Sequence, residues 1–165
     1  FDPSLVYTHT DSPLGPMVLA ATDLGLAGVW FDGQRHQPEM TSWQRAPQPT
    51  QHPVLQQTAS QLQAYFAGQC TTFEVPLDLR GGTEFQQQVW RALYAMTSGA
   101  TLSYGALSTQ IGRARAVRAV GAAVGRNPIS IIVPCHRVLG ADGSLTGYAG
   151  GLDRKTALLQ LEGVA

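Results

Sequence analysis

Cys135 is the side chain in this sequence that is best placed to act as a nucleophile. It follows an apolar run at 129–133 and stands between Pro134 and His136, with Arg137 next in the chain. A proline cannot continue a central strand, so the chain must turn just before the cysteine. A free thiol is weakly ionised at neutral pH, and a neighbouring base or positive charge increases the ionised fraction. The order of residues therefore predicts a reactive cysteine with histidine as its base.

A cysteine–histidine pair also needs a third group that orients the base. Glu162 is the candidate for this role, although it lies far from His136 in the sequence and spacing alone does not bring the two together. Asn127 precedes Pro128 a few residues upstream of Cys135, where an asparagine side chain can close a tight turn. The candidate site thus extends to both sides of the cysteine.

The other cysteine and the histidines do not predict a metal centre or a disulfide framework. Cys70 is the second of the two cysteines, and the four histidines are scattered without paired spacing. Two free thiols in a cytoplasmic protein are favoured over one disulfide. We expect no metal and no cofactor.

Charge is unevenly distributed, although the chain has 11 basic and 11 acidic residues. Residues 1–80 carry three basic and seven acidic side chains, whereas residues 81–165 carry eight basic and four acidic ones. Six arginines and no acid occur between Phe85 and Ala141. Because arginine binds phosphate in a bidentate manner and stacks on bases, this segment predicts a surface for a polyanion. The alternative is a solvated basic helix face.

The first half of the chain predicts a sheet with one helix. Polar, proline-rich residues 33–51 indicate a loop, and a helix over 53–67 follows, opened by a proline and closed by Gly68. Residues 72–79 are a further strand or an extended linker. Three short β-prone runs separated by turn residues indicate an antiparallel meander: 4–9, 16–22 and 25–32.

The second half of the chain is helical in pattern. Gly81-Gly82 marks the predicted boundary between a domain at 1–80 and a domain at 81–165, because the sign of the charge changes there. Thr83 and Gln86 have the spacing of a capping box at the start of a helix. That helix has an apolar stripe made of Phe85, Val89, Leu93 and Met96.

Two short helices then meet at Gly112, one capped by Ser103 over 104–111 and one over roughly 114–124. The second bears arginines, and the pair is typical of a helix-turn-helix. A last helix, capped by Asp153, carries Leu158, Leu159 and Leu161 on its apolar positions.

Composition excludes several classes of protein. With 44% hydrophobic residues the chain can bury a core, so wholesale disorder is excluded. No apolar stretch is long enough to cross a membrane, and no signal peptide is visible at the N-terminus, which lacks an initiator Met.

The motif NPISIIVPCHRV at 127–138 resembles the active-site signature of the O6-alkylguanine-DNA alkyltransferases. The resemblance continues through the second half and more loosely through SPLGP and AYFAG in the first 80 residues. It is carried by FQQQVW at 85–90, SYGAL at 103–107, RAVGAAVGRNP at 118–128, and GYAGG with Arg154-Lys155 at 147–155.

The resemblance implies an α+β fold. Its N-terminal part is an antiparallel sheet with a helix, similar to ribonuclease H. Its C-terminal part is mostly helical, with a winged helix-turn-helix-like DNA-binding motif.

The implied activity is that of a methylated-DNA–protein-cysteine S-methyltransferase, which moves the alkyl group of O6-alkylguanine in double-stranded DNA irreversibly onto Cys135. O4-alkylthymine is a second candidate substrate. Such a protein acts once, on a nucleotide flipped out of the duplex, as a cytoplasmic monomer without an obligate protein partner.

The resemblance also assigns roles to individual residues. Glu162, His136, a water and Cys135 form a hydrogen-bonded relay, and Asn127 holds the active-site turn. Further residues contact the flipped nucleotide or the DNA. The side chains of Tyr104, Val124 and Tyr148 and the backbone of Cys135, Val138 and Ala149 face the base, Arg118 fills the gap in the base stack, and Arg115 and Arg126 bind DNA.

This chain differs from relatives at two places. The family often has serine where Ala149 stands. We therefore expect the backbone role to be kept and a polar contact to larger adducts to be missing. A zinc site that some relatives have in the N-terminal part lacks its cysteine pair here.

Three other functions fit parts of the sequence. A helix-turn-helix regulator would use Cys135 only for packing, which is the common role of a lone cysteine. A damage sensor would bind alkylated DNA without repairing it. A thiol hydrolase would leave the helix pair and the arginines without a purpose.

Overall fold

The computed structural model describes residues 5–46 and 52–164. Residue 4 of the first predicted strand and residues 47–51 of the predicted loop lie outside the described residues. The chain divides into two compact units, Phe1–Gly81 and Gly82–Ala165.

The first unit is built on a four-stranded sheet with the strand order β3-β2-β1-β4. The predicted meander is confirmed: β1 (Val6–Thr10), β2 (Met17–Ala21) and β3 (Leu26–Phe31) pair antiparallel in sequence order. The predicted loop at 33–51 is wrong in one respect, because β4 (Gln44–Arg45) pairs parallel with β1 at the sheet edge.

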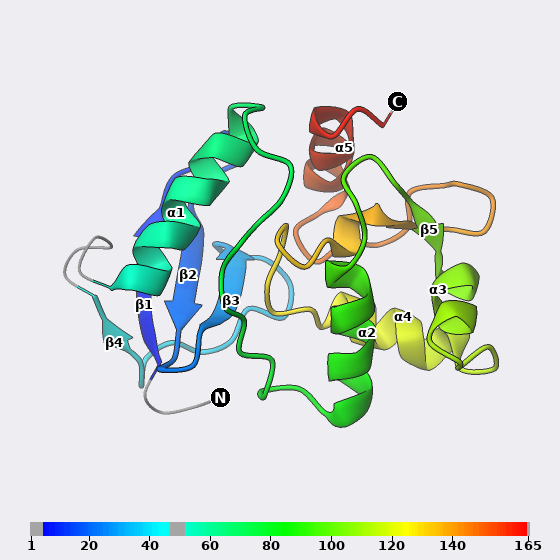
Figure 1. The fold of residues 1–165 in the computed structure, drawn as a ribbon, viewed down its shortest axis with the longest axis horizontal. Helices are drawn as coiled ribbons and strands as arrows, with labels where there is room; N and C mark the ends of the chain where they lie inside the picture. Colours follow the sequence, from blue (N-terminus) through cyan, green and yellow to red (C-terminus); the bar gives the residue numbers. More distant parts are fainter. Residues whose placement is uncertain (1–4, 47–51, 165) are drawn as a thin grey trace. The chain divides into compact units, whose positions relative to one another are not determined.

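Both faces of this sheet are covered, which explains why β2 and β3 are fully buried rather than alternating. Helix α1 (Pro53–Phe66) packs across one face (Figure 1). On the other face Trp30 belongs to a core cluster against which Trp43 packs, the two rings lying 5.7 Å apart. Gly28 must remain a glycine, because an added Cβ would collide with the Trp30 ring.

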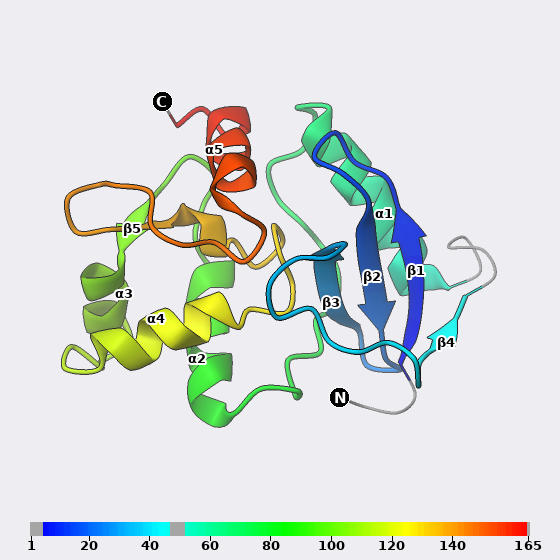
Figure 2. The same ribbon diagram turned by 180° about the vertical axis from the view of Figure 1, so that it is seen from behind.

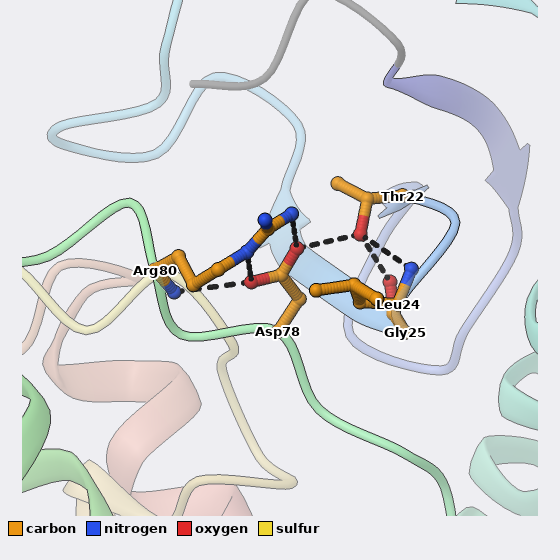
Figure 3. A network of polar contacts seen from close by, with 5 residues as sticks. All are labelled: Thr22, Leu24, Gly25, Asp78 and Arg80. Carbon is orange, nitrogen blue, oxygen red and sulfur yellow. Dashed lines mark hydrogen bonds and ion pairs between the residues drawn. The ribbon is translucent and has the colours of Figure 1, made fainter.

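Residues 72–79 form an extended segment that is tied to the start of β3. Leu26 and Leu77 form a parallel bridge, and the Leu26 N–H donates to the Pro76 carbonyl at 2.8 Å. The Asp78 carboxylate accepts hydrogen bonds from Arg80 and from the Thr22 hydroxyl, as Figure 3 shows.

Hydrogen bonds from Arg80, together with a weaker one from Thr22, lower the pKa of Asp78 from 3.8 to about 2 against the opposing effect of burial. Because the pKa is lower in the folded state, this network stabilises the unit above the ordinary pKa of aspartate. That stabilisation is lost as the pH falls toward 2.

The second unit begins with α2 (Glu84–Tyr94), and its predicted capping box is present. The Thr83 hydroxyl accepts from the Gln86 N–H at 3.1 Å, while the Gln86 side chain accepts from the Thr83 N–H at 3.0 Å. Val89, Trp90 and Leu93 are the buried residues of this helix. Phe85 and Met96 of the predicted stripe are only half-buried.

Helices α3 (Tyr104–Gln110) and α4 (Val117–Gly125) form the predicted helix pair. Ser103 caps α3, as predicted. The second helix starts at Val117 rather than Ala114, because Arg113 to Ala116 form a turn after Gly112, whose φ is +74°. Trp90 fixes α4 to α2, since its indole N–H donates to the Ala123 carbonyl at 2.8 Å.

The remaining elements frame Cys135. The 3₁₀ turn η2 (Cys135–Arg137) leads into β6 (Val138–Leu139), which pairs parallel with β5 (Leu102–Ser103). A loop then connects β6 to α5 (Leu152–Leu161), which lies above the η2 turn in Figure 2.

The predicted start and apolar face of α5 need two corrections. Gly151, with φ +96°, occupies the N-cap, so Asp153 lies in the first turn and does not cap the helix. Leu158 and Leu159 are buried as expected, but Leu161, the last residue of the helix, is exposed. Within the described residues, no helix is long and apolar enough to span a membrane.

Candidate active site

Asn127 shapes the loop that carries the cysteine. Its side-chain oxygen accepts from the Ile129 N–H at 3.0 Å, and its side-chain nitrogen donates to the Val133 carbonyl at 2.7 Å. These bonds tie both ends of 129–133 to one buried amide. Ile131 has a φ of +71° within this loop, a conformation that a β-branched residue rarely adopts. The predicted turn is therefore present, and it is held from inside by Asn127.

Cys135 begins the η2 turn and is buried. Burial raises the pKa of its thiol, while a hydrogen bond from Asn127 and the positive charge of Lys155 lower that pKa in part. Burial has the larger effect, so Cys135 rests as a neutral thiol at neutral pH. A reaction at this sulfur must therefore remove the proton during the reaction, which requires a base.

His136 and Glu162 form the pair that sequence spacing could not establish. His136 Nε2 lies 2.7 Å from Glu162 Oε2, and both side chains are almost completely inaccessible to solvent. A carboxylate only accepts hydrogen bonds, so we assign the imidazole proton to Nε2 and the lone pair to Nδ1. Nδ1 is buried and has no hydrogen-bond partner among the described residues.

The imidazole is neutral at rest. Burial lowers the pKa of His136, and the charges of Arg137 and Lys155 lower it further, whereas Glu162 acts in the opposite direction. A neutral imidazole with its Nδ1 lone pair available can accept a proton. The pair therefore has the form of a general base with its orienting carboxylate.

Arg137 has a different role from the one predicted by its position beside the cysteine. Its guanidinium points to Glu162, with Nε 2.7 Å from Oε1 and Nη2 3.1 Å from Oε2. A third N–H donates to the Met96 carbonyl at 2.8 Å. This bidentate contact holds the carboxylate in place for the histidine. Arg137 thus supports the base rather than the thiolate.

Lys155, rather than Arg137, supplies the positive charge that lowers the pKa of the Cys135 thiol. Its side chain is completely buried, and its ammonium donates to the carbonyls of Val138 at 2.7 Å and Thr146 at 3.0 Å. Burial lowers the pKa of Lys155, and the negative charge of Cys135 in its thiolate form acts in the opposite direction. The lysine links the strand after the nucleophile to the loop before α5.

Tyr104, at the start of α3, lies beside the second helix of the pair. A Cβ added to Gly121 would lie 3.7 Å from Cδ1 of the Tyr104 ring. Arg118 precedes Gly121 by three residues and is exposed, so the two lie on the same side of α4. The Tyr104 hydroxyl contacts Thr146 at 3.2 Å. These contacts bring α3, α4 and the loop before α5 together.

The other predicted site residues have defined positions but no contact with Cys135 that would establish their roles. Val124 is buried, Tyr148 and Ala149 are half-buried, and the Val138 carbonyl is held by Lys155. Arg115 and Arg126 are exposed. Among the described residues, no group of three or more His, Cys, Asp or Glu side chains is arranged to hold a metal ion.

Sequence reasoning missed the contacts that Arg137, Lys155 and Thr146 make around the site. Lys155 had a detectable signal, because it shares a helix face with the buried Leu158 and Leu159, three and four residues further on. Arg137 had none beyond its place beside His136. Thr146 lies in a loop, where spacing does not indicate contacts.

Comparison with protein families identifies the class of protein that this fold and site define. Residues 5–79 match the ribonuclease-like domain of 6-O-methylguanine DNA methyltransferase, and residues 84–164 match the DNA binding domain. The chain therefore belongs to the 6-O-methylguanine DNA methyltransferase family, and the predicted resemblance and fold class are confirmed.

Individual relatives cover nearly the whole chain. A Mycobacterium tuberculosis H37Rv protein named methylated-DNA–protein-cysteine methyltransferase is 51% identical over 156 residues, which cover 94% of this chain and 91% of that protein. One of the same name from Methanosarcina acetivorans is 46% identical over 160 residues, covering 96% and 99%. The crystal structure of M. tuberculosis OGT in complex with DNA matches with a TM-score of 0.86 and 50% identity, over 95% of this chain and 92% of that one.

Proposed function

We propose that this chain repairs DNA by direct reversal, as a methylated-DNA–protein-cysteine methyltransferase that moves one alkyl group from O6-alkylguanine to Cys135. The observation that carries the proposal is the buried hydrogen-bonded pair of His136 and Glu162. In this pair His136 directly follows the buried Cys135 on a fixed turn. Relatives with 43 to 51% identity carry the name of this activity.

The first step is removal of the thiol proton. Because Cys135 rests as a neutral thiol, its proton must leave before attack. In the relay of Glu162, His136, a water and Cys135, this proton passes through the water to Nδ1 of His136. Glu162 stabilises the imidazolium that forms, and Arg137 keeps the carboxylate in position. Lys155 stabilises the thiolate through its charge.

The thiolate then attacks the alkyl carbon. A carbon–sulfur bond forms, the bond from that carbon to O6 breaks, and its electron pair moves to guanine. Guanine takes up one proton, which balances the proton lost by the thiol. The product is an S-alkyl cysteine. Because this step does not regenerate the thiol, each protein molecule reacts once.

Guanine is a poor leaving group unless its negative charge is stabilised. We assign this to Tyr104, whose hydroxyl donates to a ring nitrogen, and to the backbone N–H of Ala149, which faces O6. The carbonyls of Cys135 and Val138 accept from the exocyclic amine, and the side chains of Val124 and Tyr148 line the pocket. Two sets of contacts support this arrangement. The Thr146 hydroxyl bonds to the Tyr104 hydroxyl, and the Lys155 ammonium bonds to the carbonyls of both Thr146 and Val138.

The target oxygen is hidden in a duplex, so the nucleotide must leave the base stack at a cost of a few kcal/mol. Arg118 is exposed on α4 beside Tyr104 and is suited to fill the gap, while Arg115 and Arg126 bind phosphates. The proposal includes a monomer that acts in the cytoplasm on chromosomal DNA, without metal or cofactor.

The function is tested by mixing the protein with a duplex that contains a single O6-methylguanine. Digestion of the DNA should show the loss of one O6-methylguanine per protein molecule, and excess DNA should remain methylated. Tight binding with no guanine restored would identify a damage sensor instead. Repair of many duplexes per protein would contradict the single-use mechanism.

Arg118→Ala should slow repair of duplex DNA by about 10-fold or more, because unstacking costs a few kcal/mol and the arginine offsets part of it. Reaction with free O6-benzylguanine should change less than about twofold, since the free base needs no flipping. The measurement is the two rate constants in single-turnover conditions.

Arg115→Ala and Arg126→Ala are the matched controls. They should mainly weaken DNA binding and reduce its salt dependence by roughly one ion each. Equal slowing of the duplex and free-base reactions by Arg118→Ala would place this residue in the pocket or in folding and remove its role in flipping.

A further inference from the structure

Thr146 makes two contacts that join the loop before α5 to different parts of the site. Its hydroxyl donates to the hydroxyl oxygen of Tyr104, with the two oxygens 3.2 Å apart, although 42 residues separate them. Its backbone carbonyl accepts from Lys155 Nζ at 3.0 Å. The side chain of Thr146 is half-buried.

Lys155 makes the position of Thr146 rigid. A completely buried ammonium is stable only where its protons are hydrogen-bonded, and two of its partners are the carbonyls of Thr146 and Val138. Movement of Thr146 would break one of these bonds and leave part of a buried charge unsatisfied. The Thr146 hydroxyl therefore approaches Tyr104 from a fixed backbone.

The direction of the hydrogen bond matters for Tyr104. A phenolic hydroxyl has one proton and can also accept hydrogen bonds. When Thr146 donates to the oxygen, the proton of Tyr104 remains available for another acceptor. A hydroxyl that accepts a hydrogen bond is polarised and becomes a better donor in turn.

We propose that Thr146 is a positioning residue for alkyl transfer, whose hydroxyl turns the Tyr104 proton toward the ring nitrogen of the departing guanine. This inference rests on the proposed function, in which Tyr104 stabilises that leaving group. Negative charge on the ring grows as the bond to O6 breaks, so the hydrogen bond is stronger in the transition state than in the bound substrate. Thr146 therefore acts on the maximal rate rather than on DNA binding.

The test compares four variants in single-turnover repair of a duplex with one O6-methylguanine: Thr146→Val, Thr146→Ser, Tyr104→Phe and the double variant Thr146→Val with Tyr104→Phe. Valine has the shape of threonine without the hydroxyl. Thr146→Val should lower the rate constant at saturating protein about 5-fold, the size expected for one neutral hydrogen bond. The half-saturating protein concentration should stay within about twofold. Thr146→Ser should keep the parent rate within about twofold, because it retains the hydroxyl.

The double variant separates a positioning role from a structural one. In the Tyr104→Phe background the hydroxyl of Thr146 has nothing to orient, so adding Thr146→Val should slow repair no further. Ser144→Ala is the loop control: it removes a hydroxyl that bonds to Asp142 in the same loop, and the rate should not change.

Two results would overturn the inference while leaving the proposed function intact. One is a Thr146→Val effect of the same size with and without the Tyr104 hydroxyl. The other is a Thr146→Ser variant as slow as Thr146→Val. Failure of the parent protein to transfer any methyl group would instead refute the proposed function itself, so the two failures are distinguishable.

Discussion

Cys135→Ser should abolish alkyl transfer, with a rate loss of more than about 10³-fold, while the protein still binds methylated duplex DNA. A serine hydroxyl is a weak nucleophile without a strong base, and His136 is kept weakly basic by burial and by two nearby cations. The change replaces one sulfur with one oxygen on a turn that Asn127 holds through the backbone, so the fold should be retained.

Cys70→Ala is the matched control for this prediction. Cys70 is half-buried in the first unit, where its thiol contacts the Thr72 carbonyl. The variant should accept one alkyl group per molecule, as the parent does. Transfer by Cys135→Ser at a measurable rate would place the nucleophile elsewhere.

Glu162→Gln should lower the maximal transfer rate about 10²-fold, which is within the range of general-base catalysis. An amide cannot stabilise the imidazolium as a carboxylate does. Its N–H₂ group can also turn toward the Nε2–H of His136, from which it cannot accept a hydrogen bond. Removing the carboxylate also leaves Arg137 buried without its counter-charge, which should cost about 3–5 kcal/mol of stability. Rates must therefore be measured at a temperature where thermal unfolding shows the variant to be folded.

The pH dependence of this variant has a defined sign. In the parent the rate falls as the pH drops through the pKa of His136, because a protonated imidazole cannot accept the thiol proton. Glu162 raises the pKa of His136, so its loss should move this fall in rate to lower pH. The measurement is the single-turnover rate as a function of pH.

Arg137→Gln breaks the same buried ion pair from the other side. It should destabilise the protein by a similar amount, but the carboxylate remains on His136, so the rate should fall much less. Because Arg137 lowers the pKa of His136, the acid limb of the pH profile should move upward, opposite to Glu162→Gln. Equal rate losses and identical profiles in the two variants would mean that Glu162 only supports the fold.

Features set by neighbouring residues were predictable from the sequence. The capping box of Thr83 and Gln86, the cap at Ser103 and the turn closed by Asn127 each depend on a few consecutive residues. The three antiparallel strands also follow from local patterns, since turn residues separate them. The motif around Cys135 indicated the family because its residues are contiguous.

Features that depend on packing between distant segments could not be predicted in this way. The side chain of Arg137 could have turned to the thiol or to Glu162, and only the fold shows that it bonds the carboxylate and the Met96 carbonyl. The short strand β4 pairs with β1 through backbone groups, without a sequence signal of its own. Burial of Cys135, which raises the pKa of its thiol, is likewise a property of the assembled unit.

The most direct test of the account is the mass of the protein after reaction with O6-methylguanine duplex DNA, followed by mapping of the modified peptide. We expect the intact protein to gain one methylene, the gain to stop at one per molecule, and the peptide that contains Cys135 to carry it. Unchanged mass after the DNA has been bound, or a methyl group found on Cys70 or another residue, would contradict the assignment of Cys135 as the acceptor.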